Sequence, residues 1–137
     1  MSALRLRLAT AADGDAIAHL HADSWRRHYR GAYADEFLDC DVVTDRLAAW
    51  RVRLGEADPR RLTFLAEDRE RALGFASAYL DDDPAWGSLL DNVHVAAEHQ
   101  RRGIGARLLE RTAEAVAGQP GPARRQSKRR LWGVGAR

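Results

Sequence analysis

Hydrophobic and polar residues alternate strictly over residues 4–8, which predicts a half-buried β-strand at the start of the chain. Three later apolar runs have the length and composition of strands: Arg61–Ala66, Leu73–Leu80 and Ser88–Val95. Charged residues at 67–71 separate the first two of these runs. We therefore expect the two runs to pair as an antiparallel hairpin.

Apolar residues recur at helical spacing between the first two strands. The first helix is expected to begin at Thr10, whose hydroxyl can cap the amide of Asp13, and Gly31 should end it. One broad face of this helix carries Ile17, Leu20, Ser24, Trp25 and His28. For His21, Trp25 and His28, core packing and a substrate-facing wall are equally open interpretations.

Two more helices follow from the same periodicity. The second begins near Asp35, is interrupted near residues 39–41, restarts with Thr44 as a cap and ends at Gly55. The third covers 103–117 and is expected to turn inward Ile104, Leu108, Leu109, Ala113 and Val116. The order of elements is thus strand, two helices, three strands and a helix. This order predicts an α+β fold with a mostly antiparallel sheet flanked by helices.

Composition narrows the class of protein. Hydrophobic residues make up 45% and charged residues 31% of the 137 residues, as in a soluble globular domain. No apolar run approaches the ~20 residues that a membrane-spanning helix needs, and the N-terminus has no signal-peptide pattern. We therefore expect a cytoplasmic protein with no membrane partner. The single cysteine, Cys40, excludes a disulfide framework.

Charge divides the chain into a core domain over 1–118 and an atypical tail over 119–137. The tail carries six basic residues and no acidic one, whereas the core carries more acidic than basic residues. Nucleic-acid binding by the whole chain is therefore not supported. A binding module built on the tail, with Trp132 among its arginines, is kept as an alternative. Within the tail, Leu131–Val134 has the composition of one short strand.

The most informative stretch joins the 88–95 strand to the last helix. A polar loop follows the strand, and the helix begins at Gly103-x-Gly105, where free backbone amides and the helix dipole favour a phosphate group. Arg101 and Arg102 add positive charge beside the loop. On this pattern alone, a tight strand-to-helix turn with solvated arginines is the alternative interpretation.

Gln100-x-x-Gly103-x-Gly105, placed after a strand that ends in Val93-His94-Val95, resembles the acetyl-CoA signature of the GNAT superfamily of N-acetyltransferases. The resemblance covers nearly all of residues 4–117. It implies a GNAT-like fold and the transfer of an acetyl group from acetyl-CoA, as co-substrate, to a primary amine. The amine, on a small molecule or a peptide, would attack the thioester directly.

The resemblance also implies roles for particular residues. The cofactor contacts would be Val93, His94, Val95, Gln100, Arg101, Arg102, Gly103, Ile104, Gly105 and Ala106. The wall of the acceptor site would be formed by Trp25, Tyr29 and Tyr33. The backbone of the fourth strand would pair with the pantetheine arm, and a bulge would splay the sheet there. No His, Cys, Asp or Glu has a recognisable metal-ligand spacing, so we predict no metal.

Asp91 is the candidate for taking the proton from the attacking amine, directly or through water. Strand alternation predicts that Asp91 faces the same way as Val93 and Val95, while Leu90, Asn92 and His94 face the other way. An edge carboxylate that is salt-bridged to an arginine is an equally good interpretation of Asp91.

The family continues after this helix with a fifth strand, a fourth helix and two more strands. Here, Leu131–Val134 can supply only the fifth strand, and the Asn and Tyr that the family carries on the fourth helix have no counterpart. We interpret 119–137 as out-of-frame or decayed coding sequence, or alternatively as a tail that docks on a partner. A catalytically impaired acetyl-CoA binder is thus an alternative function, and an unpaired sheet edge predicts a possible homodimer.

Overall fold

The computed structural model describes residues 4–55, 60–83, 87–118 and 131–134, so 119–130 and 135–137 of the predicted tail lie outside the described residues. Five strands form one sheet in the order of the chain. They are β1 (Leu4–Leu8), β2 (Arg61–Asp68), β3 (Arg71–Asp83), β4 (Gly87–Val95) and β5 (Leu131–Val134). Strands β1 to β4 are antiparallel and β5 runs parallel to β4, which confirms the predicted fold class.

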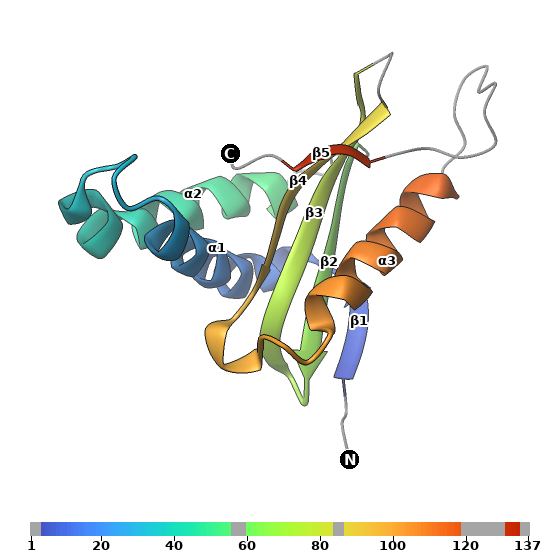
Figure 1. The fold of residues 1–137 in the computed structure, drawn as a ribbon, viewed down its shortest axis with the longest axis horizontal. Helices are drawn as coiled ribbons and strands as arrows, with labels where there is room; N and C mark the ends of the chain where they lie inside the picture. Colours follow the sequence, from blue (N-terminus) through green and yellow to red (C-terminus); the bar gives the residue numbers. More distant parts are fainter. Residues whose placement is uncertain (1–3, 56–59, 84–86, 119–130, 135–137) are drawn as a thin grey trace.

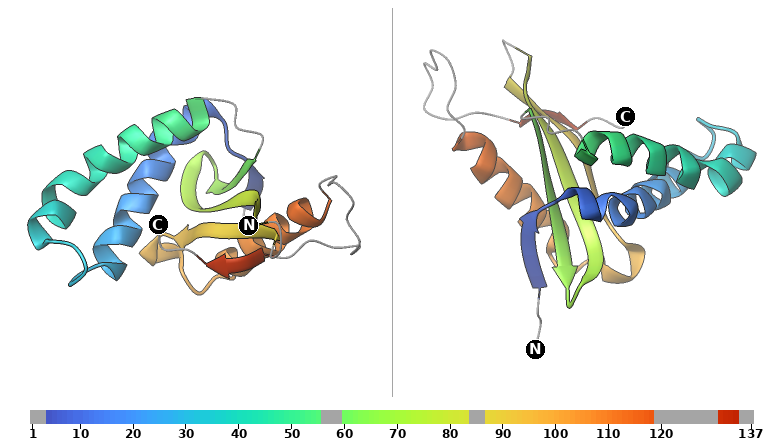
Figure 2. Two further views of the ribbon diagram at one scale, coloured as in Figure 1. Left: turned by 90° about the horizontal axis from the view of Figure 1, so that it is seen from above. Right: turned by 180° about the vertical axis from the view of Figure 1, so that it is seen from behind.

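Helices cover both faces of this sheet. On one face lie α1 (Gly14–His28) and α2 (Val42–Gly55), and on the other lies α3 (Ile104–Ala117) (Figures 1 and 2). Short turns join them: η1 (Ala11–Asp13), the π-helical η2 (Phe37–Asp41) and η3 (Ala97–His99). At the start of η1 the Thr10 amide donates to Asp13 Oδ2 over 2.7 Å, so the predicted pair does begin the helical region.

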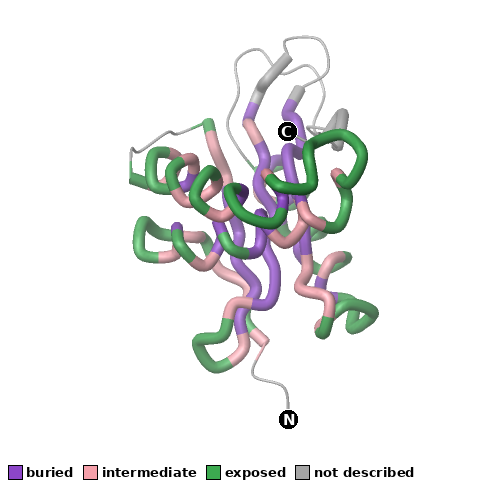
Figure 3. The backbone as a smooth tube through the Cα atoms, turned by 90° about the vertical axis from the view of Figure 1, so that its left-hand side faces the viewer, coloured by how far each residue is buried: buried purple, intermediate pink, exposed green. Residues whose placement is uncertain are grey.

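The core is split by the sheet into two apolar layers. Between the sheet and α1 and α2 lie Ile17, Leu20, Trp50, Leu65 and Phe75. Between the sheet and α3 lie Phe64, Ala66, Leu73, Ala76, Ile104 and Leu108. Buried positions therefore follow the central strands, while the outer surfaces of the helices are exposed (Figure 3).

Two helix predictions were wrong in detail. Thr44 does not cap a new helix, because the π-helical turn η2 leads into α2 at Val42 without a break. On α3 the buried positions are spaced by four and include Thr112, whereas Leu109 is 37% exposed and Ala113 is exposed. Thr112 is accommodated because its hydroxyl donates to the Leu108 carbonyl oxygen over 2.7 Å.

A bulge in β4 overturns the predicted alternation. Ser77 pairs with Asn92 and Ala78 with Leu90, so Asp91 is one extra residue on β4. Val93 packs on the α3 side of the sheet, but the Asp91 side chain lies near Arg61 and Ser77, on the side of α1 and α2. The extra residue breaks the alternation of side chains between the two faces of the sheet. The alternation of apolar and polar residues in the sequence does not show where such a residue is inserted.

The sheet edge beside β4 is only partly covered. The predicted strand at 131–134 is confirmed as β5, which pairs with β4 from Ser88 to Leu90. Beyond Leu90, toward α3, no described strand lies against β4 (Figure 1). A homodimer through this side of the sheet stays a prediction.

His21 is a fully buried residue of the α1 core layer, at 0% exposure. Trp50 Nε1 lies 2.8 Å from its Nδ1 atom and Trp25 Nε1 lies 3.1 Å from its Nε2 atom. An indole N–H can only donate a hydrogen bond. In a protonated imidazole both ring nitrogens would also carry a hydrogen, so neither could accept from the tryptophan that faces it. Burial, followed by the charges of Arg46 and Arg53, lowers the pKa of His21 to about 3. The core interpretation of His21 is the one that these contacts support.

Stability is expected to fall as the pH drops from 6.5 toward 3, because the unfolded chain binds a proton at His21 and the folded chain does not. Because of His21 alone, the free energy of unfolding should be about 2 kcal/mol lower at pH 5 than at neutral pH. Urea unfolding at pH 7 and pH 5 measures the difference. The variant His21→Gln should lose this part of the pH dependence, and His19→Gln, exposed on the same helix, should keep it. An unchanged slope in His21→Gln would contradict the assignment.

Candidate functional site

The loop between β4 and α3 has an unusual backbone. Arg101 has φ +66° and Gly103 has φ +77°, so two of the three residues 101–103 have a left-handed backbone conformation. Gly103 is the N-cap of α3, and the first helical hydrogen bond runs from the Arg107 amide to the Gly103 oxygen over 3.1 Å. The amides of the first helical turn therefore have no acceptor within the helix and are available to an anion.

A pocket of about 420 Å³ lies between this loop and the edge of β4. It is lined by His28, Val93, His94, Val95, His99, Gln100, Arg101, Gly103, Ile104, Gly105 and Ala106. The structure thus brings together nine of the ten predicted cofactor residues, and none of the described residues that line this pocket is acidic. Arg102 instead lines a separate hollow of about 760 Å³ at the β2–β3 turn, with Arg69 and Arg71.

His28 and His99 also line the pocket. For His28 the sequence had left a substrate-facing wall open as one of two interpretations, and His99 was not predicted as a site residue. His28 is the last residue of α1, and only the packing of α1 against the sheet brings it to β4. The sequence offered the helical face that His28 shares with Trp25 as a signal, but that face also suits a core.

The backbone of β4 presents polar groups to the open edge. The Ala96 amide donates to the Leu73 oxygen over 2.8 Å, so it points toward β3. Backbone groups alternate in direction along a strand, so those of Val93 and Val95 point away from β3. The Gln100 amide group donates to the Val95 oxygen over 2.9 Å, which agrees with that direction.

Gly74 on β3 allows a close approach at the same place, and no pattern in the sequence pointed to it. A Cβ atom there would lie 2.7 Å from the His94 oxygen and 3.1 Å from the Val95 Cα atom. Because both neighbours are backbone atoms, they cannot yield by rotating a side chain. A glycine at this position therefore lets β3 and β4 lie close together beside the pocket.

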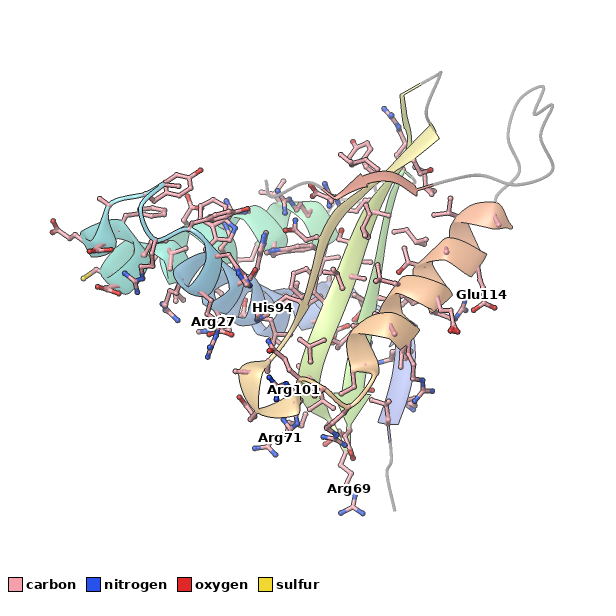
Figure 4. All side chains as sticks on the ribbon, viewed as in Figure 1. Arg27, Arg69, Arg71, His94, Arg101 and Glu114 are labelled. Atoms are coloured by element: carbon pink, nitrogen blue, oxygen red, sulfur yellow. The ribbon has the colours of Figure 1, made fainter. Side chains whose placement is uncertain are left out.

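His94 forms a pair with Asp23 of α1. The His94 Nε2 atom lies 2.9 Å from Asp23 Oδ2, and the His94 side chain is only 4% exposed. Burial raises the pKa of Asp23, but hydrogen bonds from His94 and Arg27 outweigh it and lower this pKa below its usual value. The carboxylate is then an acceptor, so His94 Nε2 must donate and Nδ1 must carry the lone pair. Burial also lowers the pKa of His94, which favours the neutral ring. Figure 4 shows His94 between β4 and α1, close to Arg27.

Asp91 is 4% exposed and lies 3.4 Å from Arg61 Nη1, measured at its Oδ2 atom. Arg61 also donates to the Ser77 hydroxyl over 2.8 Å. Burial is the main cause that raises the pKa of Tyr29. Electrostatic interactions with Tyr33 and with Asp91 raise it further. These contacts agree with the interpretation of Asp91 as a salt-bridged carboxylate, and they also place it near the aromatic residues of α1.

The three residues predicted to wall the acceptor site do gather in space. The Trp25 and Tyr33 rings stack at 5.1 Å between centroids, and Trp25 and Tyr29 meet edge to face at 5.2 Å. Tyr33 remains 46% exposed, so the cluster reaches the surface. Phe37, which the sequence analysis did not single out, joins it at 5.8 Å from Tyr33.

In the comparison with protein families, the model of the Acetyltransferase (GNAT) family matches residues 15–125. The chain belongs to the GNAT acetyltransferase family. This membership confirms the resemblance that rested on Gln100, Gly103 and Gly105. The comparison with curated proteins gave no match.

Solved structures with the same fold agree with the GNAT assignment. PaiA N-acetyltransferase from Thermoplasma acidophilum, in complex with coenzyme A, gives a TM-score of 0.68 at 17% identity over 85% of this chain and 72% of that chain. An acetyltransferase from Thermus thermophilus gives 0.59 at 28% identity over 86% and 73% of the two chains. A possible acetyltransferase from Clostridium difficile 630 gives 0.69 at 12% identity over 96% and 78%.

Among the described residues of this GNAT chain, no helix is long and apolar enough to cross a membrane. Within the same ranges, no three His, Cys, Asp or Glu side chains gather as metal ligands do.

Proposed function

We propose that the chain binds acetyl-CoA and transfers its acetyl group to a primary amine. The observation that carries the proposal is the pocket between the β4 edge and the start of α3. It offers free helical amides and the positive charge of Arg101, and none of its described lining residues is acidic. A diphosphate fits this chemistry, because the amides and the guanidinium both favour negative charge there.

The remainder of acetyl-CoA would lie along β4. The outward backbone groups of Val93 and Val95 match the amides of a pantetheine arm, which can extend the sheet as a strand does. Since β5 pairs with β4 only as far as Leu90, this part of the edge is open to a ligand. The carbonyl of the thioester would then lie near the bulge at Asp91.

In the proposed reaction the amine nitrogen attacks the thioester carbonyl carbon directly. A tetrahedral intermediate forms, its oxyanion is stabilised by a backbone N–H of β4, and the carbon–sulfur bond then breaks. The thiolate of coenzyme A leaves, the proton of the amine passes to a base, and the thiolate then takes up a proton from that base through water. The products are an amide and coenzyme A.

Two side chains are candidates for this base. Asp91, acting directly or through water, is the candidate that the sequence favours, but its Oδ2 atom lies 3.4 Å from Arg61 Nη1 and is already engaged in that ion pair. His94 lines the pocket and burial lowers its pKa, so its Nδ1 lone pair could take the proton while Asp23 accepts from Nε2. We therefore assign the base to His94 and keep Asp91 as the second candidate.

Acetyl-CoA at ~100 times its dissociation constant should stabilise the chain by about 2.7 kcal/mol. In Gly103→Glu this stabilisation should vanish for two reasons. The new carboxylate would repel the diphosphate, and a residue with a side chain would have to adopt the left-handed φ of +77° that favours glycine. Thermal unfolding with and without acetyl-CoA measures the effect. Gly55→Glu is the matched control, since a Cβ at Gly55 meets nothing within 4 Å.

Equal stabilisation of wild type and Gly103→Glu would contradict the proposed phosphate site. Stabilisation without release of free thiol, over a panel of amines, would instead identify an acetyl-CoA binder that does not catalyse transfer.

A further inference from the structure

Three arginines, Arg46, Arg53 and Arg61, lie on the side of the sheet that α1 and α2 cover, and Arg61 pairs with Asp91. The guanidinium carbon of Arg46 is 4.5 Å from the centre of the Trp25 ring. Arg53 lies in the same way 4.9 Å from Trp50, and Arg61 lies 5.9 Å from Trp50. Positive charge is thus concentrated around two tryptophans, next to the aromatic wall of the predicted acceptor site.

Among the described residues, the negative charge at this cluster does not balance the positive charge. Arg46 pairs with Asp45 over 2.6 Å, and Arg61 pairs with Asp91 over 3.4 Å. For Arg53, Nη1 is buried and none of the residues that the structure describes accepts a hydrogen bond from it. Burial and the charge of Arg61 lower the pKa of Arg53, whereas Asp91 opposes this shift. A buried guanidinium donor without a partner is costly, and an anionic ligand would remove that cost.

The position of the cluster connects it to the transfer reaction. Arg46 stacks on Trp25, and Asp91, the partner of Arg61, influences Tyr29. Trp25 and Tyr29 are two of the three residues expected to wall the acceptor. An anion bound at Arg53 would therefore belong to the acceptor, near the bulge of β4, and not to the diphosphate at the start of α3.

We propose that the acceptor is an amine that also carries a carboxylate, and that Arg53 binds this carboxylate. The proposal rests on the acetyl transfer proposed above and adds the class of acceptor. Arg53 can donate two parallel N–H groups to a carboxylate, the geometry for which a guanidinium is suited. The aromatic rings of Trp25 and Tyr29 would then cover the carbon chain between the carboxylate and the amine.

Matched acceptors test this proposal. β-Alanine and its amide differ in the carboxylate, and the amide has the less basic amine, so reactivity alone favours the amide. We expect kcat/KM to be roughly 10- to 100-fold higher for β-alanine, the range of one charge-assisted hydrogen bond. A dipeptide and its C-terminal amide, measured in parallel, show whether the carboxylate belongs to a free amino acid or to a peptide.

Variants assign the preference to Arg53. In Arg53→Gln the ratio between β-alanine and its amide should fall toward one, and Arg53→Lys should restore part of it. Arg51→Gln is the control, because Arg51 lies on the same helix with a side chain 65% exposed. Urea unfolding of each variant separates a loss of preference from a loss of the fold.

A binding measurement keeps the test independent of turnover. Without acetyl-CoA, β-alanine should raise the melting temperature of the wild type more than its amide does, and Arg53→Gln should abolish that difference. Equal kcat/KM or equal stabilisation for the two compounds in the wild type would overturn the carboxylate proposal and leave acetyl transfer standing. A protein that acetyl-CoA stabilises but that acetylates no amine would count against transfer, while the binding difference would still decide the role of Arg53.

Discussion

Replacing His94 with glutamine is expected to lower kcat/KM for acetyl transfer by roughly 10²- to 10⁴-fold, the contribution of a general base. Glutamine can still donate to Asp23 from its amide nitrogen, so the pairing of β4 with α1 should persist. It has no lone pair that takes a proton near neutral pH. Thiol release from acetyl-CoA, with saturating amine, measures the loss.

The pH dependence of the same rate separates a base from a structural residue. Burial lowers the pKa of His94, so kcat/KM of the wild type should fall as the pH drops through a value below the ordinary 6.5. His94→Gln should lack this fall. His99→Gln, at another histidine of the pocket, is the control and should keep it. A larger loss in Asp91→Asn than in His94→Gln would return the role of base to Asp91.

Replacing Trp50 with alanine is expected to lower the free energy of unfolding by about 3–5 kcal/mol, the cost of deleting a large buried side chain. Trp50 is 0% exposed, packs edge to face on Phe75 with ring centroids 5.6 Å apart, and donates to His21 Nδ1 over 2.8 Å. The variant therefore loses both apolar packing and a buried hydrogen bond. Urea unfolding at neutral pH measures the change.

Val52→Ala, two residues away on α2 and 59% exposed, is the matched control for Trp50→Ala. A surface truncation of this kind should change the free energy of unfolding by less than about 0.5 kcal/mol. If Trp50→Ala cost no more than Val52→Ala, the α1 and α2 layer would not depend on Trp50.

Much of the fold was predictable because apolar residues recur along the chain at the regular spacings of strands and helices. Alternation at Leu4–Leu8 and the apolar runs of β2, β3 and β4 predicted the four antiparallel strands, and helical spacing predicted α3. The π-helical turn before Val42 was not predictable, because the energy difference between one π turn and a helix break depends on how Leu38 and Val42 pack against Trp25. Such packing is decided between elements and leaves no local pattern.

The candidate site was predictable only where it is contiguous in sequence. Gln100, Gly103 and Gly105 lie on one loop, so the loop and its resemblance to the acetyl-CoA signature of the GNAT superfamily pointed to a phosphate site. His94 and Asp23 are 71 positions apart, and they pair only because α1 packs on β4. No spacing rule relates two such residues. The sequence therefore placed His94 among the cofactor contacts and did not include Asp23 in the site.

The sequence by itself determined the family, the order of elements and the glycine-bearing loop before α3, because each rests on residues close together along the chain. The tertiary structure decided which side of the sheet Asp91 faces, that His94 pairs with Asp23, and that Arg53 Nη1 is buried with no acceptor among the described residues. The physical reason is that one bulge residue reverses the facing of the residues before it on the strand, and that packing between α1, α2 and the sheet sets which side chains meet. Both depend on neighbours that only the folded chain brings together.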